Sequence, residues 1–174
     1  MPKRRVFVDT NAIFPAVQAG EWKRLCGYFS IETVGAVVEE TQNGGVNRKG
    51  YVPVDRAMLE QSLAKIRHPS DEDRAAFRLK ALELNLELDA GERDLLAYLL
   101  AHEKPRPEIL VLTTSDRAAV RASCALGWKD ALISLERLLT EAGARPAALK
   151  SLADHYCEPW LCQARTTFLL GLFK

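Results

Sequence analysis

The sequence has neither a strong net charge nor a long apolar run. It contains 24 lysine and arginine residues against 23 aspartates and glutamates, which gives a formal net charge of +1. So small an excess does not attract nucleic acid through the field of the whole molecule, and any such binding would require local basic patches. No segment approaches the roughly 20 consecutive apolar residues of a membrane-spanning helix. We therefore expect no association with a membrane.

Cysteine is scarce as well, and its spacing follows no repeated pattern. The four cysteines are Cys26, Cys124, Cys157 and Cys162. His155 precedes the last two, but a fourth zinc ligand is missing and the spacing fits no usual structural zinc site. The segment Met1–Arg5 runs directly into an apolar stretch, which leaves no room for the apolar region of a signal peptide. These features predict a soluble, cytoplasmic protein with reduced thiols.

Short apolar runs alternate with amphipathic patterns along the chain. Val6–Val8 and Ile109–Leu112 have the length and composition of buried parallel strands. The alternation of such runs with helical spacing is typical of an α/β layer fold. With 174 residues, of which 48% are hydrophobic, the chain can bury one substantial core. We predict one α/β domain over residues 1–145 and a helical extension over 146–174, packed on that domain or at an interface.

The remaining elements follow from breaks in the hydrophobic pattern. Helices are expected over 12–26 with an interruption near Gly20, 33–42, 116–126 and 135–142. Further strands are expected at Tyr28–Ile31 and Ala131–Ser134. Asn43–Gly50 is predicted to be a loop because its glycines end helices.

Two more helices are predicted from apolar residues at helical spacing. Their apolar faces are Leu59, Leu63 and Ile66 in the first, and Ala75, Leu79, Leu82 and Leu86 in the second. Ser70 and Asp73 form a capping signal before the second helix. The C-terminal run Phe168–Phe173 is apolar, so it either covers the core or contacts a second copy of the chain.

Four carboxylates stand where predicted elements begin or end, namely Asp9, Glu40, Glu92 and Asp116. Asp9 directly follows the first apolar run, and Asp116 follows the second through Thr113–Ser115. Because ligand sites in parallel sheets form outside the carboxyl ends of the strands, these two acids can meet in space. Clustered like charges are costly without a cation, and oxygen ligands suit Mg²⁺ or Mn²⁺. The acids therefore predict a divalent-metal site, although Asp9 and Asp116 could each be only a helix cap.

The helical wheel supports Glu92 and leaves the second acid undecided. Glu92 projects onto the apolar face of its helix, which is formed by Leu95, Leu96, Leu99 and Leu100. If this first turn were exposed instead, Glu92 would only complement the helix dipole. For the helix over 33–42, the wheel does not distinguish Glu40 from Glu39.

Four segments, in this order, resemble the motifs of the PIN-domain ribonucleases, a family that includes the VapC-like toxins. They are Val6–Asn11, Val37–Glu40, Gly91–Glu92 and Leu112–Asp116. The likeness extends over roughly residues 5–135. It implies a three-layer α/β/α domain with a central parallel sheet, and cleavage of RNA that depends on Mg²⁺ or Mn²⁺. For a toxin it also implies an antitoxin partner.

The resemblance implies roles for individual residues. The expected catalytic and metal-binding acids are Asp9, Glu40, Glu92 and Asp116, with Glu40 favoured over Glu39 by the family motif. The family pattern also gives supporting roles to Thr10 and Asn11. Thr114 and Ser115 are expected to support the site because their hydroxyls, beside Asp116, can hydrogen-bond carboxylates, metal-bound water or phosphate oxygens. A metal-activated water would then hydrolyse the phosphodiester and leave a 5′ phosphate and a 3′ hydroxyl. The tail past residue 145 has no counterpart in the family pattern.

Residues that contact RNA are predicted from charge and aromatic character. The candidates are Arg48, Lys49, Tyr51, Arg117 and Arg121. Two other functions stay open at this point. One is a PIN-fold module that binds RNA or a protein without cleaving it, and the other is a metal-dependent nuclease that acts on DNA.

Overall fold

The computed structural model describes residues 3–43 and 52–172. Its centre is an all-parallel sheet of four strands in the order β3-β2-β1-β4. The strands are β1 (Arg5–Val8), β2 (Ser30–Val34), β3 (Lys65–Arg67) and β4 (Leu110–Thr113). The predicted α/β fold with a central parallel sheet is confirmed. The predicted loop Asn43–Gly50 lies outside the described residues, except for Asn43, which ends a helix.

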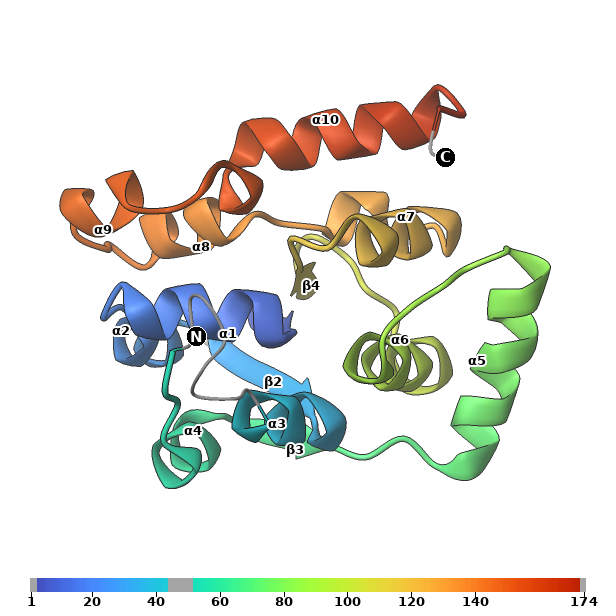
Figure 1. The fold of residues 1–174 in the computed structure, drawn as a ribbon, viewed down its shortest axis with the longest axis horizontal. Helices are drawn as coiled ribbons and strands as arrows, with labels where there is room; N and C mark the ends of the chain where they lie inside the picture. The colour runs from blue at the N-terminus through green and yellow to red at the C-terminus, as the bar shows by residue number, and fades with distance from the viewer. Residues whose placement is uncertain (1–2, 44–51, 173–174) are drawn as a thin grey trace.

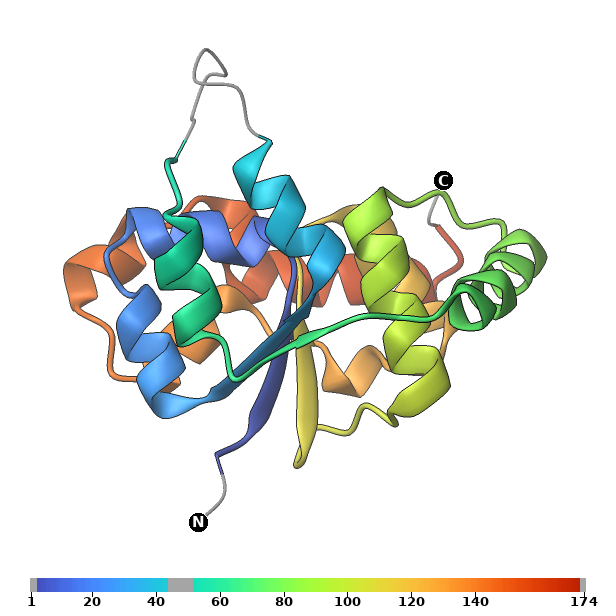
Figure 2. The same ribbon diagram turned by 90° about the horizontal axis from the view of Figure 1, so that it is seen from below.

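Helices flank the sheet and follow its strands. Before β4 they are α1 (Thr10–Gln18), α2 (Trp22–Tyr28), α3 (Gly35–Gln42), α4 (Arg56–Ser62), α5 (Asp71–Glu83) and α6 (Ala90–His102). After β4 they are α7 (Arg117–Ala125), α8 (Leu135–Glu141), α9 (Pro146–Lys150) and α10 (Glu158–Leu169), with short 3₁₀ turns η1 (Lys129–Ala131) and η2 (Asp154–Tyr156). Figure 2 shows α1, α2 and α4 on one side of the sheet and α5, α6 and α7 on the other. Because both faces are covered, the central strands are buried runs rather than alternating ones.

The chain changes direction between β1 and β4. From β1 the chain passes to β2 and β3 on one side, and it then returns to the other side of β1 to form β4. Val8 pairs with Thr113, so the next residues, Asp9 and Thr114, leave the sheet side by side. Such a change of direction is where open α/β sheets bind ligands.

Three predicted elements differ in the structure. The second strand begins at Ser30 rather than Tyr28, because Tyr28 still belongs to α2. Ile66 was predicted to lie on a helix, but α4 ends at Ser62 and Ile66 pairs with Thr33 in the edge strand β3. The run Ala131–Ser134 forms only one bridge to β4, between Leu132 and Leu112. Short apolar runs fit a helix and a strand equally well, and tertiary pairing decides between them.

The predicted apolar face of α5 is wrong. Leu79 and Leu82 are 72% and 78% exposed, whereas Phe77 is buried. The helix is held instead by Phe77 and by Arg74, which binds Asp94 of α6 through two hydrogen bonds of 2.9 Å. The capping pair is confirmed, since Ser70 and Asp73 bind each other's backbone amides.

The C-terminal segment packs against the end of the domain that carries α7 and α8. Figure 1 shows α10, in red, running along α7. Leu161 and Ala164 belong to the same hydrophobic core as the sheet, while Leu169, Leu170 and Leu172 are more than half exposed. Among the described residues, no helix is long and apolar enough to cross a membrane.

Candidate active site

Asp9 ends the central strand and starts α1. Its Oδ1 accepts a hydrogen bond of 3.0 Å from the Ala12 amide, so the side chain is a helix cap. The residue is also only 3% exposed, and its Oδ2 is buried without a hydrogen-bond partner among the described residues. A cap needs one oxygen at the helix start. The second, unpaired oxygen in a buried position is costly and calls for another partner.

Asp116 occupies the equivalent place after β4. Its Oδ1 accepts hydrogen bonds from the amides of Ala118 at 2.6 Å and Ala119 at 3.0 Å, which caps α7. Its own amide donates to the Thr114 hydroxyl at 3.1 Å. Asp9 and Asp116 are therefore both helix caps, and they stand at the ends of neighbouring strands.

Glu92 lies in the first turn of α6 and lines the same pocket as Asp9. The other residues of this pocket are Leu95, Leu96, Leu112, Thr114 and Ala119. Glu92 accepts one long hydrogen bond of 3.4 Å, from the Asp89 amide. An acid in this mainly apolar pocket has few groups to stabilise its charge.

The electrostatics of the pocket show that three of the acids influence one another. Burial raises the pKa of Asp9 to about 7, although the nearby polar groups of Thr114 and Asn11 favour its charged form. Burial also raises the pKa of Glu92 to about 8. The charge of Asp116 contributes to both increases, and the charge of Asp9 contributes to that of Glu92. Among the described residues, no lysine or arginine forms an ion pair with any of the three.

Glu40 joins three elements rather than pointing into the pocket. Its Oε1 accepts a hydrogen bond of 2.7 Å from the Gly91 amide, and its Oε2 accepts one of 3.3 Å from the Thr10 hydroxyl. A Cβ at position 91 would lie 2.6 Å from Glu40 Oε2, so only glycine allows this approach. Glu39 is exposed and pairs with Arg56 at 2.6 Å. Of the two neighbouring acids, only Glu40 contacts the elements that carry the other carboxylates.

The other predicted supporting residues lie around the same strand ends. Thr10 binds Glu40, and Asn11 is close enough to Asp9 to favour its charged form. Thr114 stands between Asp9 and Asp116. Ser115 lines an adjacent pocket that also contains Asn11.

The predicted RNA-contacting residues fall into two groups. Arg48, Lys49 and Tyr51 lie outside the described residues. Arg117 is exposed and lines a groove together with Arg121, between the α5–α6 connection and the end of α10. Arg121 stabilises the fold there, because it donates hydrogen bonds of 2.7 and 3.4 Å to the carbonyl oxygens after α5. Arg117 is thus the more available cation beside Asp116.

Sequence reasoning missed several polar residues near the carboxylates. Arg78 and Arg93 are exposed and line a groove between α5 and α6, and Arg93 directly follows Glu92 in the sequence. The wheel places Arg93 off the apolar face, but only the position of α5 reveals the second arginine beside it. His155 and Tyr156 line the pocket of Ser115 and Asn11, and no local pattern indicates that the tail returns to this place.

The carboxylates do not form a complete metal cage. In the described part of the chain, no group of three or more histidine, cysteine, aspartate or glutamate side chains is arranged to hold an ion. The thiols of Cys157 and Cys162 each donate a hydrogen bond to an oxygen within their own segment. Asp9, which is buried, and Glu92, which is half-buried, form a pair of acids without a cation among the described residues, and Asp116 is near enough to raise the pKa of both.

A scan against models of protein families gives no match, and a search of curated proteins gives no match either. The function is therefore inferred from the site itself.

Proposed function

We propose that this chain is a metal-dependent nuclease with a PIN-like fold, which hydrolyses phosphodiester bonds of RNA with the help of Mg²⁺ or Mn²⁺. The observation that carries the proposal is Asp9, a buried carboxylate with an unpartnered oxygen among the described residues, which lines one pocket with Glu92 and interacts with the charge of Asp116. Acids in such surroundings repel one another and need a positive charge, which the described residues do not supply. The polar groups that the described residues give this pocket are oxygen donors, which suit a hard divalent cation.

The contacts of each acid indicate whether it would bind the metal ion or position another residue. Asp9, Glu92 and Asp116 would hold the ion, since each has an oxygen that no amide or hydroxyl of the described residues occupies. Glu40 would position the start of α6, because both its oxygens already bind Gly91 and Thr10. A bound ion would supply positive charge against the phosphate and lower the pKa of a nucleophilic water. Arg117, Arg78 and Arg93 would attract the phosphates of the strand on either side.

The experiment compares wild type and Asp9→Asn on matched single strands of RNA and DNA, with Mn²⁺ or Mg²⁺. Asparagine keeps the helix cap and removes the charge, so we expect folding to persist and cleavage to fall about 100-fold or more. Glu39→Gln is the matched control, because this acid is exposed and outside the pocket. Full activity of Asp9→Asn would discard the site. Faster cleavage of the DNA strand would change the substrate to DNA.

A binding module without catalysis is the second candidate. Two observations favour it: Asp9 and Asp116 already serve as helix caps, and the described residues hold no preformed metal cage. Calorimetric titration with Mn²⁺ separates the two functions. Binding of Mn²⁺ and RNA without any cleavage would establish the module and reject the enzyme.

A further inference from the structure

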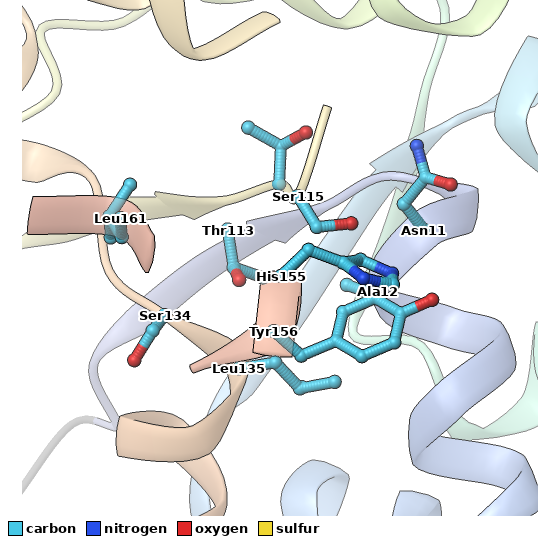
Figure 3. A pocket seen from close by; sticks show the side chains of 10 residues that line it. Asn11, Ala12, Thr113, Ser115, Ser134, Leu135, His155, Tyr156 and Leu161 are labelled. Atoms are coloured by element: carbon cyan, nitrogen blue, oxygen red, sulfur yellow. The ribbon is translucent and has the colours of Figure 1, made fainter. Parts of the chain in front are cut away.

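The C-terminal segment contributes two aromatic rings to a pocket beside the carboxylates. This pocket is lined by the start of α1, the end of β4, the start of α8 and η2. Figure 3 shows His155 and Tyr156 lying together in it, on the side toward Asn11. The two rings have centroids 4.0 Å apart and planes inclined by 49°. The segment from residue 146 onward therefore does more than cover the core.

The aromatic pocket and the acid pocket share one wall. Thr114 lines both, and its neighbours Thr113 and Ser115 line the aromatic side. Tyr156 is also close enough to Asp9 for an electrostatic interaction. Burial raises the pKa of the Tyr156 phenol, and the charge of Asp9 adds to the increase. A group held at the carboxylates would therefore be separated from these rings by the shared wall at Thr114.

The two rings differ in exposure in a way that suits stacking. Tyr156 is half-buried and packs against the hydrophobic core, so it is fixed. His155 is exposed and rests on it, which leaves the imidazole available to a flat ligand. Asn11 and Ser115 add an amide and a hydroxyl, groups that hydrogen-bond the edges of bases. Bases of single strands stack on exposed aromatic rings of this kind, whereas bases of a duplex are occupied by pairing.

We propose that His155, supported by Tyr156, stacks an unpaired nucleobase of the strand whose phosphodiester lies at the carboxylates. The inference rests on the proposed nuclease function and narrows its substrate to single-stranded nucleic acid. It gives the C-terminal segment the task of placing the nucleotide next to the reacting phosphate.

The test measures binding and cleavage of a fluorescent single-stranded RNA and of versions with one base removed at successive positions. In wild type, removal of the stacked base should weaken binding about 5- to 20-fold at one position. His155→Ala should show a similar loss with the intact RNA and no further loss when that base is absent. His155→Phe should restore affinity, because it keeps a ring. In cleavage, His155→Ala should raise KM and leave kcat nearly unchanged.

The matched control is His102→Ala. His102 also rests on a tyrosine, Tyr98, with centroids 4.9 Å apart, but it lies at the far end of α6. It should behave as wild type with every RNA.

The outcomes separate the stacking site from the nuclease. Cleavage that is normal in His155→Ala, with an unchanged response to base removal, would overturn the stacking site and leave the nuclease intact. Binding that depends on His155 and one base, without cleavage of any strand, would support the stacking site and reject the nuclease. Absence of RNA binding by wild type would overturn the stacking site.

Discussion

Two buried carboxylates of the same sheet have opposite surroundings. Glu32, in the middle of β2, is 2% exposed and binds the guanidinium groups of Arg5 at 2.6 Å and Arg67 at 2.7 Å. Asp9, at the end of β1, is 3% exposed and has no cation among the described residues. Burial opposes ionisation at both positions, but the two arginines lower the pKa of Glu32, whereas the pKa of Asp9 rises to about 7.

The difference separates acids that stabilise the fold from acids that we propose to form a functional site. The network of Glu32 extends to Glu103, which Arg5 binds at 2.6 Å, and it connects β1, β2, β3 and the end of α6. It is compensated within the protein. Among the described residues, no lysine or arginine compensates the pair of Asp9 and Glu92. A fold that keeps such a pair uncompensated loses stability, and functional sites are the usual reason for that loss.

Breaking the compensated network should have the largest effect on stability. Arg5→Met leaves Glu32 with one arginine and Glu103 without its ion pair, so we expect the free energy of unfolding to fall by about 2–3 kcal/mol. Denaturant unfolding measures the change. Arg56→Met is the control, because this arginine pairs with the exposed Glu39 and Glu60 and its loss should change little. Equal effects of the two substitutions would show that burial of the network is unimportant.

Removing a charge from the pair of Asp9 and Glu92 should instead increase the free energy of unfolding. The folded protein holds protons on Asp9 and Glu92 up to pH values of about 7 and 8, where the unfolded chain has already released them. The free energy of unfolding of the metal-free protein should therefore fall as pH rises from the ordinary carboxyl range to about 8. Asp9→Asn should reduce this slope and stabilise the protein at pH 8 by roughly 1–3 kcal/mol.

Mn²⁺ should restore the stability that the protein loses as pH rises. If Asp9 holds the ion as proposed, Mn²⁺ at pH 8 should raise the Tm of wild type, because it would bind only the folded protein, and it should have little effect on Asp9→Asn. Thermal unfolding across pH with and without Mn²⁺ measures both effects. Parallel pH curves for the two proteins would show that Asp9 is not the source of the strain.

The smallest change in stability should come from loss of the contact between Glu40 and Gly91. Gly91→Ala places a Cβ 2.6 Å from Glu40 Oε2, so Glu40 must leave the start of α6, at a cost of about 1–2 kcal/mol. Cleavage should fall as well if Glu40 positions Glu92. Gly27→Ala is the control, because no atom lies within 4 Å of its added Cβ and alanine favours the helix α2. Destabilisation by both would assign the effect to the helices in general.

The sequence predicted the parts of the fold that local patterns determine. β1, β4 and α6 have strong apolar patterns, and their acids follow from position on a strand end or a helix wheel. It could not show that Glu40 binds the Gly91 amide, since their contact spans 51 residues. The prediction of a buried face at Leu79 and Leu82 was wrong. Their spacing is typical of such a face, but α5 packs through Phe77. His155 and Tyr156 reach the site through tertiary packing alone.

Asp9 and Asp116 cap helices, and we propose that they also hold a metal ion. These two roles affect how the sequence can evolve. Asparagine caps a helix as well as aspartate does. A relative with asparagine at positions 9 and 116 would keep both helix starts, lose the negative charge and gain stability. With the proposed nuclease function, two conservative substitutions would thus give an inert descendant that only holds its ligand, and the fold would favour this change wherever selection for cleavage ceased.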